Sequence, residues 1–318
     1  MPLSEKALIR RTRQRAGRAP GVLGIGDDCA SVRIPPGHEA LVTTDFSLED
    51  VHFRRRLQPA ASIGHRCLLR GLSDIAAMGG EPLAVFLSLA LPGTLPQSWG
   101  DEFLYGLLKL AGDFGITLAG GDTAKSPGKI LADIVVLGSV PRGKAILRSS
   151  ARPGDRIFVT GTLGGAATTL RMLLEDRKKK GPAAELRSYF YPIPRIEVGH
   201  ILRKKGVASS MIDISDGLST DLAHICEESG VGAEINADAI PRARYGKLRK
   251  EVDLRLALHG GEDYELLFTS SAKTRVPAQI ANVPITEIGR IVRGRGIGLT
   301  LNNKITRLVP QGWEHFRN

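Results

Sequence analysis

The seven residues 211–217 (MIDISDG) constrain the chain more than any other stretch. Their apolar run carries Asp213 and continues into Asp216, and residues 218–230 then have the pattern of a helix. An apolar strand followed by an acidic turn and a helix is how α/β proteins present polar side chains at the carboxyl end of a strand. Two like charges about 4 Å apart repel by roughly 4 kcal/mol at an effective dielectric constant of 20, so this turn predicts a bound cation.

The first half of the chain repeats this acidic theme. Residues 40–46 (ALVTTDF) predict a strand that ends at Asp45, and residues 115–120 predict another that ends just before Asp122. A helix predicted over residues 61–79 places an aspartate in a small, apolar face, which is costly unless the carboxylate has a partner. Carboxylate and hydroxyl oxygens suit a hard cation. The residues alone therefore predict a polycarboxylate Mg²⁺ site that handles a nucleoside triphosphate.

The length of 318 residues predicts two domains. The composition changes over residues 141–154, which are basic and interrupted by proline and glycine. We place the boundary there, between an N-terminal domain of residues 1–147 and a C-terminal domain of residues 148–318. The alternation of apolar strand patterns with helical patterns indicates the α/β class.

Composition limits the function classes. The net charge of +11 allows nucleic-acid binding or steering of anionic substrates, but aromatic residues make up only 5% of the chain, which opposes base-stacking surfaces. The sequence contains no run of about 18 apolar residues and no apolar leader region, so neither a membrane span nor a secretory signal is expected. The three cysteines are widely spaced and fit a reducing, cytoplasmic compartment.

Several candidates also have an ordinary structural explanation. The glycine-rich residues 21–32 form an incomplete GxGxxG and are equally well read as an acidic turn. Arg148 could reach a phosphate or be an exposed linker residue, and a single histidine such as His52 is usually structural. The aromatic cluster around Trp313 is a pocket wall or a docking anchor. The sequence contains neither a Walker A string nor HExxH.

Six motifs, in order, resemble the thiamine-monophosphate kinase family, within the aminoimidazole ribonucleotide synthetase superfamily. They are GIGDDCA, TTDFSLEDVHF, LSDIAAMGGEP, GGDT, DISDGLSTDL and GGEDYELLFT. The resemblance extends from about residue 21 to Trp313. It implies a two-domain aminoimidazole ribonucleotide synthetase-like α/β (α+β) fold. The mixed sheet of the N-terminal domain would form a homodimer, and that domain would bind ATP and Mg²⁺.

The resemblance also implies a reaction. The phosphate of thiamine monophosphate would attack the γ-phosphate of ATP directly, without a phosphoenzyme, and several Mg²⁺ ions would bridge the phosphates. The metal ligands carried over by motif are Asp28, Thr43, Thr44, Asp45, Asp74, Asp122, Asp213 and Asp216. The ATP contacts are Gly121, Asp122, Arg148 and Ser215, and the substrate contacts are His52, Glu262 and Trp313. Asp27, Tyr105 and the basic N-terminal segment receive no role.

Two departures from the family pattern stand out. Relatives usually carry glycine where this chain has Asp50, close to His52, and they often carry Thr-Arg where it has Ala124-Lys125. Three alternatives remain open at this point. The chain could be another ATP-using member of the superfamily, although Cys29 follows the acidic pair rather than preceding it as a selenophosphate synthetase would require. It could bind nucleic acid, or it could be a non-catalytic paralogue in which Asp50 is the lesion.

Overall fold

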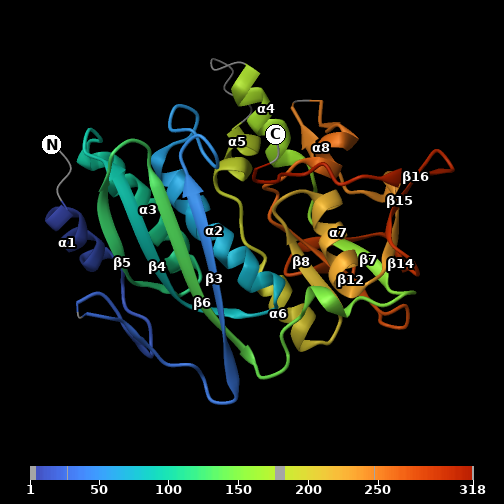
Figure 1. Ribbon diagram of the computed structural model, residues 1–318, viewed down its shortest axis with the longest axis horizontal. Coiled ribbons are helices and arrows are strands. Elements are labelled where there is room, and N and C mark those ends of the chain that lie inside the picture. Colours follow the sequence, from blue (N-terminus) through green and yellow to red (C-terminus); the bar gives the residue numbers. More distant parts are fainter. Residues whose placement is uncertain (1–4, 27, 176–182, 247, 317–318) are drawn as a thin grey trace. The chain divides into compact units, whose positions relative to one another are not determined.

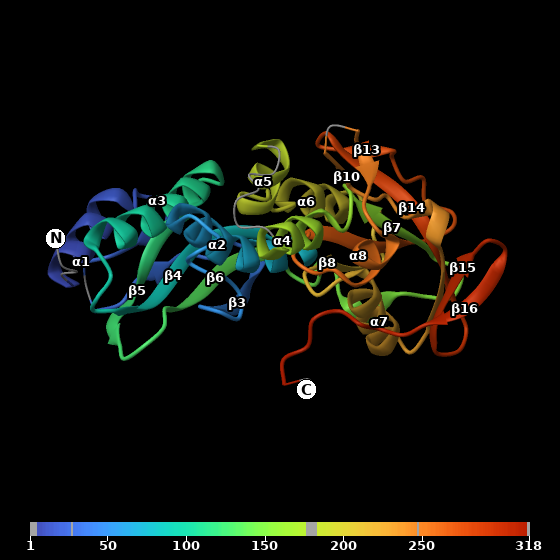
Figure 2. The same cartoon turned by 90° about the horizontal axis from the view of Figure 1, so that it is seen from above.

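A computed structural model describes residues 5–26, 28–175, 183–246 and 248–316 (Figures 1 and 2). Asp27 and the lysine-rich tract at 178–180 therefore lie outside the described residues. The chain divides into two compact units. Unit 1 comprises residues 1–75 and 80–143, and unit 2 comprises residues 76–79 and 144–318.

Unit 1 is a four-stranded mixed sheet with helices on one side, as Figure 2 shows. Its elements are α1 (Glu5–Arg15), β1 (Val22–Leu23), β2 (Ser31–Val32), β3 (His38–Leu48), α2 (Ala60–Ala77), β4 (Glu81–Pro92), α3 (Gln97–Asp113), β5 (Thr117–Ser126) and β6 (Leu131–Pro141). The strand order is β3-β6-β4-β5; β4 and β5 are parallel and the other neighbours are antiparallel. α2 and α3 pack closely, because a Cβ at Gly64 would lie 1.9 Å from the Phe103 carbonyl oxygen.

The strands of unit 1 run past the positions predicted from the sequence. β3 pairs with β6 as far as Leu48, and β5 pairs with β4 as far as Ser126. The predictions that strands end at Asp45 and before Asp122 are therefore wrong, and both aspartates lie within strands. The reason is that Phe46 to Leu48 and Thr123 to Ser126 extend ladders whose partners are remote in sequence, so no local signal marks the end.

Unit 2 is built on a larger sheet. Its elements are η1 (Arg148–Ser150), β7 (Arg156–Thr160), α4 (Gly165–Glu175), α5 (Ala183–Phe190), α6 (Ile196–Lys204), β8 (Ser210–Ile214), α7 (Leu218–Ser229), β9 (Gly232–Asn236), η2 (Ala237–Ala239), β10 (Arg244–Tyr245), β11 (Lys250–Glu251), α8 (Leu254–His259), β12 (Glu265–Ser270), β13 (Gln279–Ile280), β14 (Val283–Val292), β15 (Gly296–Leu301) and β16 (Lys304–Leu308). The strand order is β16-β15-β9-β14-β7-β12-β8, with β13 on β14. Of the described pairs in this sheet, β9 with β15 alone is parallel.

The core of unit 2 fixes the acidic turn that follows β8. Helix α7 contributes Leu218, Leu222 and Ile225, which are fully buried together with Ile212 and Ile214 of β8. This 3- and 4-residue spacing places one apolar stripe of the helix in the core. Both flanks of residues 213–217 are therefore packed, so the turn is held at a defined edge of the sheet (Figure 1). None of the described helices combines the length and the apolar content needed to cross a membrane.

Candidate functional site

Three of the predicted oxygen ligands come together in unit 1. The hydroxyl of Thr43 on β3 donates a hydrogen bond to the Asp74 carboxylate on α2. Asp45 follows Thr43 by two residues and shares its face of β3, because side chains alternate along a strand. Burial and the nearby Asp74 carboxylate together raise the pKa of Asp45 to about 7, against the opposing effect of Arg70. A carboxylate whose pKa is raised by a neighbouring carboxylate in this way fits a bound cation.

Thr44 lies on the other face of β3. It is exposed, as are its neighbours Val42 and Phe46, and it pairs with Val135 of β6. The Thr44 side chain therefore does not join Thr43 and Asp45. The period of two in a strand could have indicated this from the sequence alone.

A cavity of about 390 Å³ lies in unit 1 between α1, the loop that joins β1 to β2, and strands β4 and β5. Asp28, Gly121 and Asp122 line it. Gly121 has a φ of 144°, and a Cβ there would lie 1.9 Å from the carbonyl oxygen of Leu87, so the close approach of β5 to β4 requires glycine. The Asp122 carboxylate accepts a hydrogen bond from the backbone N–H of Thr123 at 2.8 Å. The structure thus groups three of the predicted nucleotide and metal residues around one cavity.

His52 and Asp50 follow β3 in unit 1. The backbone N–H of Leu48 donates to Nδ1 of His52 at 3.0 Å, which fixes the imidazole ring. Asp50 has a φ of 67°, in the left-handed region that favours glycine, and this conformation accounts for the glycine that the family pattern places there. Its carboxylate lies 3.0 Å from Nζ of Lys129, and hydrogen bonding from that lysine lowers the pKa of Asp50. The added charge of Asp50 is thus paired with a lysine on the protein surface.

In unit 2 the turn after β8 collects three carboxylates. Asp221 accepts hydrogen bonds from the backbone N–H groups of Asp216 at 3.2 Å and Gly217 at 3.0 Å. Burial raises the pKa of Asp221 well above its usual range, and the nearby carboxylates of Asp213 and Asp216 raise it further. Asp213 is itself only 3% exposed. Carboxylates gathered in this way, two of them buried, favour the binding of a cation at this turn of unit 2.

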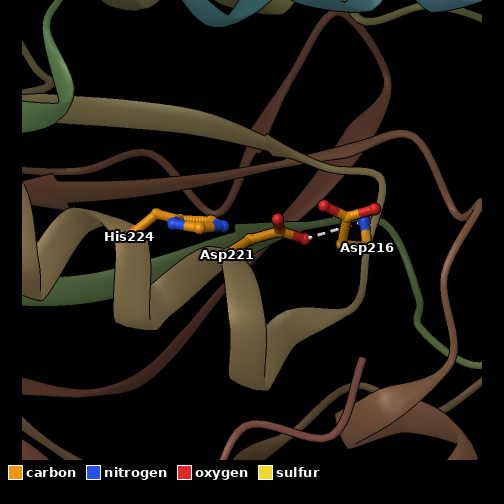
Figure 3. Close-up of side chains that lie close together, drawn as sticks. All are labelled: Asp216, Asp221 and His224. Atoms are coloured by element: carbon orange, nitrogen blue, oxygen red, sulfur yellow. Dashed lines mark hydrogen bonds between the residues drawn. The ribbon is translucent and has the colours of Figure 1, made fainter. Parts of the chain in front are cut away.

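Sequence reasoning missed Asp221 and His224. With Asp216 they form a group whose ligand atoms lie within 4.8 Å of one another, as Figure 3 shows. The signal was available, because residues three positions apart in a helix share one side and Asp221 falls in the first turn of α7, where a carboxylate caps free N–H groups. His224 therefore belongs to the surroundings of the acidic turn.

The predicted substrate residues of unit 2 lie beside the same turn. The backbone N–H of Glu262 donates to the Ser215 carbonyl at 2.8 Å, and that of Trp313 donates to the Asp216 carbonyl at 3.1 Å. The indole of Trp313 is 52% exposed and contacts His315 edge-on. The turn 213–217 thus carries two predicted metal ligands and holds two predicted substrate contacts.

Arg148 and Asp263 have different surroundings. The carbonyl of Arg148 accepts a hydrogen bond from Ser229 at the last residue of α7, a helix about 18 Å long at 1.5 Å per residue. The backbone of Arg148 thus lies at the end of α7 opposite to the acidic turn.

Asp263 accepts hydrogen bonds from the N–H groups of Gly164 at 2.6 Å and Ala166 at 3.2 Å. It therefore caps the start of α4, and burial raises its pKa to about 7.

Comparison with known proteins identifies the family. Residues 26–140 match the AIR synthase related protein, N-terminal domain, and residues 152–302 match the C-terminal domain of the same family. A thiamine-monophosphate kinase from Salmonella typhimurium is 36% identical over 330 residues, which cover 99% of each chain. These matches confirm the fold class inferred from the sequence.

Solved structures agree. The thiamine-monophosphate kinase of Stenotrophomonas maltophilia K279a is 36% identical, with a TM-score of 0.82 over 94% of this chain and 97% of that one. A structure of AaThiL complexed with AMPPCP and TMP is 31% identical, with a TM-score of 0.79 over 99% of this chain and 97% of that one. The chain therefore belongs to the thiamine-monophosphate kinase family of AIR synthase related proteins.

Proposed function

We propose that the protein transfers the γ-phosphoryl group of ATP to thiamine monophosphate and so forms thiamine diphosphate. The observation that carries this proposal is the acidic turn after β8, where the carboxylates of Asp213, Asp216 and Asp221 lie close together. The backbone of the same turn accepts hydrogen bonds from the N–H groups of Glu262 and Trp313. Carboxylates bind the metal ions of a phosphoryl-transfer site. Glu262 and Trp313 suit a substrate that carries a cationic aromatic ring. The family membership and the AaThiL complex with AMPPCP and TMP support the same reaction.

The nucleotide belongs, in this proposal, with the cavity of unit 1 that Asp28, Gly121 and Asp122 line. Gly121 lies in the lining of this cavity, and its missing Cβ lets β5 pack against Leu87 of β4. Ser215 and Arg148, which belong to unit 2, are proposed as ATP contacts from the family motifs. The assignment of each of these residues to ATP is part of the proposal.

Mg²⁺ fits two groups of oxygen ligands, and when bound it would neutralise phosphate charge and polarise the transferred group. In unit 1 the group contains Thr43, Asp45 and Asp74, with Asp28 and Asp122 at the cavity. In unit 2 it contains Asp213 and Asp216. The raised pKa values of Asp45 and Asp221 mark where negative charge is incompletely compensated by the protein. Thr44 would take part only through its backbone, because its side chain lies on the open face of β3.

The substrate would be held through its charge and its rings. The half-exposed indole of Trp313 offers a face for a cationic thiazolium or an aminopyrimidine ring, and Glu262 offers a carboxylate to an amine. His52, fixed through Nδ1, would contact the substrate phosphate. The substrate phosphate would attack the γ-phosphate of ATP directly and displace ADP, so that no phosphoenzyme forms.

A homodimer formed through unit 1 is also part of the proposal. The face of the β3-β6-β4-β5 sheet opposite the helices exposes Val42 by 65% and Phe46 by 56%. Apolar side chains grouped on an open sheet face favour burial against a second copy. We further propose a cytoplasmic location, which suits the three free thiols, and no nucleic-acid or membrane partner.

The reaction is tested directly by a product assay. Purified protein is incubated with ATP, Mg²⁺ and thiamine monophosphate, and thiamine diphosphate is followed by fluorescence after oxidation to thiochrome. We expect product that depends on Mg²⁺ and disappears with EDTA, and no product when thiamine replaces its monophosphate. Failure to form thiamine diphosphate, with ATP still bound, would move the assignment to another acceptor within the superfamily.

Replacing Glu262 by glutamine should raise the KM for thiamine monophosphate by about tenfold and leave the KM for ATP nearly unchanged. The physical reason is that a hydrogen bond between charged groups contributes about 1.5–3 kcal/mol, part of which survives in the neutral amide. Initial rates measured against each substrate separately check the expectation. The exposed acid Glu227 provides a matched control, Glu227→Gln, which should change neither constant. Equal increases for both substrates would argue against a substrate role for Glu262.

A further inference from the structure

The segment 311–313, close to the C-terminus, lies directly on the first turn of α7. Three consecutive backbone N–H groups donate to the start of α7 and to the acidic turn that precedes it. Gln311 donates to Oγ of Ser219 at 3.4 Å, and Gly312 donates to Oγ1 of Thr220 at 3.1 Å. Trp313 donates to the carbonyl oxygen of Asp216 at 3.1 Å. Two of these bonds go to the first turn of α7 and the third to the acidic turn just before it, and together they fix the path of the segment.

The contact at Gly312 is close. A Cβ at this position would lie 2.2 Å from the Asp216 carbonyl oxygen and 2.5 Å from Oγ1 of Thr220. Any side chain would therefore push the segment away from the turn. Only glycine allows the backbone of residue 312 to lie in contact with both groups.

The turn itself is fixed by further hydrogen bonds. The Asp221 carboxylate accepts the N–H groups of Asp216 and Gly217, and Oγ of Ser219 lies 2.8 Å from Nδ1 of His259. The Ser215 carbonyl meanwhile accepts the N–H of Glu262 at 2.8 Å. Two successive carbonyls, of residues 215 and 216, thus hold the two candidate substrate contacts. The acidic turn is a common support for metal ligands and substrate ligands.

We infer that Thr220 is a positioning residue for substrate recognition, because its hydroxyl docks Gly312 on α7 and thereby places the Trp313 ring beside the acidic turn. This inference rests on the proposed function, in which Trp313 contacts the substrate. Trp313 is 52% exposed, so burial of the ring alone does not fix its placement and the hydrogen bonds of the docked segment contribute to it. Thr220 touches neither reactant; it acts on affinity for the cationic ring through Trp313.

The test replaces Thr220 by valine, which keeps the shape and branching of the side chain and removes the hydroxyl. The KM for thiamine monophosphate should rise about fivefold, the factor that corresponds to about 1 kcal/mol for one lost hydrogen bond. The KM for ATP and kcat should stay within about twofold. Thr220→Ser keeps the hydroxyl and should restore the KM, which a role in helix packing alone would not predict. Equal changes for both substrates, or a serine variant as impaired as the valine variant, would overturn the inference.

A second readout follows the tryptophan itself. The chain contains two tryptophans, so Trp99→Phe leaves Trp313 as the single fluorophore. In that background Thr220→Val should increase quenching of Trp313 by acrylamide, and Gly312→Ala should do the same or more. Unchanged quenching in both variants would show that the segment is not docked through Thr220. If these variants show increased quenching but the unsubstituted protein forms no thiamine diphosphate, the role of Thr220 in docking the segment would stand and the proposed function would be refuted.

Discussion

Replacing Asp213 by asparagine should lower kcat for thiamine diphosphate formation by about a thousandfold and leave the protein folded. Removing a group that stabilises developing charge costs about 10²–10³ in rate, and a lost metal ligand also displaces the ion. Asp213 is 3% exposed and lies next to the carboxylates of Asp216 and Asp221. Asparagine has nearly the same volume, so the packing of β8 against β12 is preserved.

The same substitution should have the opposite effect on stability when metal is absent. Asp213 is one of the two carboxylates that raise the pKa of Asp221, so its neutralisation removes like-charge repulsion in a buried site. In EDTA the Asp213→Asn protein should therefore unfold at a higher Tm than the unsubstituted protein, and Mg²⁺ should stabilise it less. Differential scanning fluorimetry with and without Mg²⁺ measures both effects.

Asp155 provides the matched control. It is a buried carboxylate of unit 2 outside the acidic turn, and it accepts hydrogen bonds from the Arg152 N–H at 3.1 Å and Ser209 Oγ at 2.7 Å. Asp155→Asn should lower Tm and change kcat by less than about twofold, because it weakens hydrogen bonds that only support the fold. A kcat within about tenfold of normal in Asp213→Asn would remove Asp213 from the metal site.

The part of the site that the sequence predicted well is local. Residues 210–229 form an apolar strand, an acidic turn and a helix because each is specified by neighbouring residues, and the apolar stripe of α7 had a helical period. Asp213 could therefore be placed at the end of the strand, and Ser215 and Asp216 on the turn that follows it. The period of two that separates Thr44 from Thr43 and Asp45 was equally local and could have been used.

The part that could not be predicted depends on contacts between residues remote in sequence. Asp263 caps α4 about a hundred residues earlier in the chain, and nothing near Asp263 distinguishes such a cap from a metal ligand. Strand β3 continues past Asp45 because β6 offers a complete ladder, which local sequence does not reveal. The support that the acidic turn gives to Trp313 is of the same kind, since residues 216 and 313 approach only in the folded chain.

The pKa of Asp45 makes Mg²⁺ affinity dependent on pH. Burial and the Asp74 carboxylate raise this pKa to about 7 in the folded protein, against about 3.9 in an unfolded chain. Mg²⁺ binds the ionised carboxylate, so binding below about pH 7 must release a proton. The apparent affinity of the unit 1 site should therefore fall about tenfold for each pH unit below 7. Titration calorimetry in buffers of different ionisation enthalpy, between about pH 5.5 and pH 8, measures the affinity and the released proton.

The same shift has a defined sign for metal-free stability. Between about pH 4 and pH 7 the folded state binds a proton at Asp45 that the unfolded state has lost, so stability falls as pH rises through this window. The loss amounts to at most about 4 kcal/mol, since each pKa unit corresponds to about 1.4 kcal/mol. Asp45→Asn should abolish this part of the pH dependence, raise the metal-free Tm at about pH 8, and eliminate the proton released on Mg²⁺ binding. Proton release that persists in Asp45→Asn would assign the titration to another carboxylate and separate Asp45 from the metal.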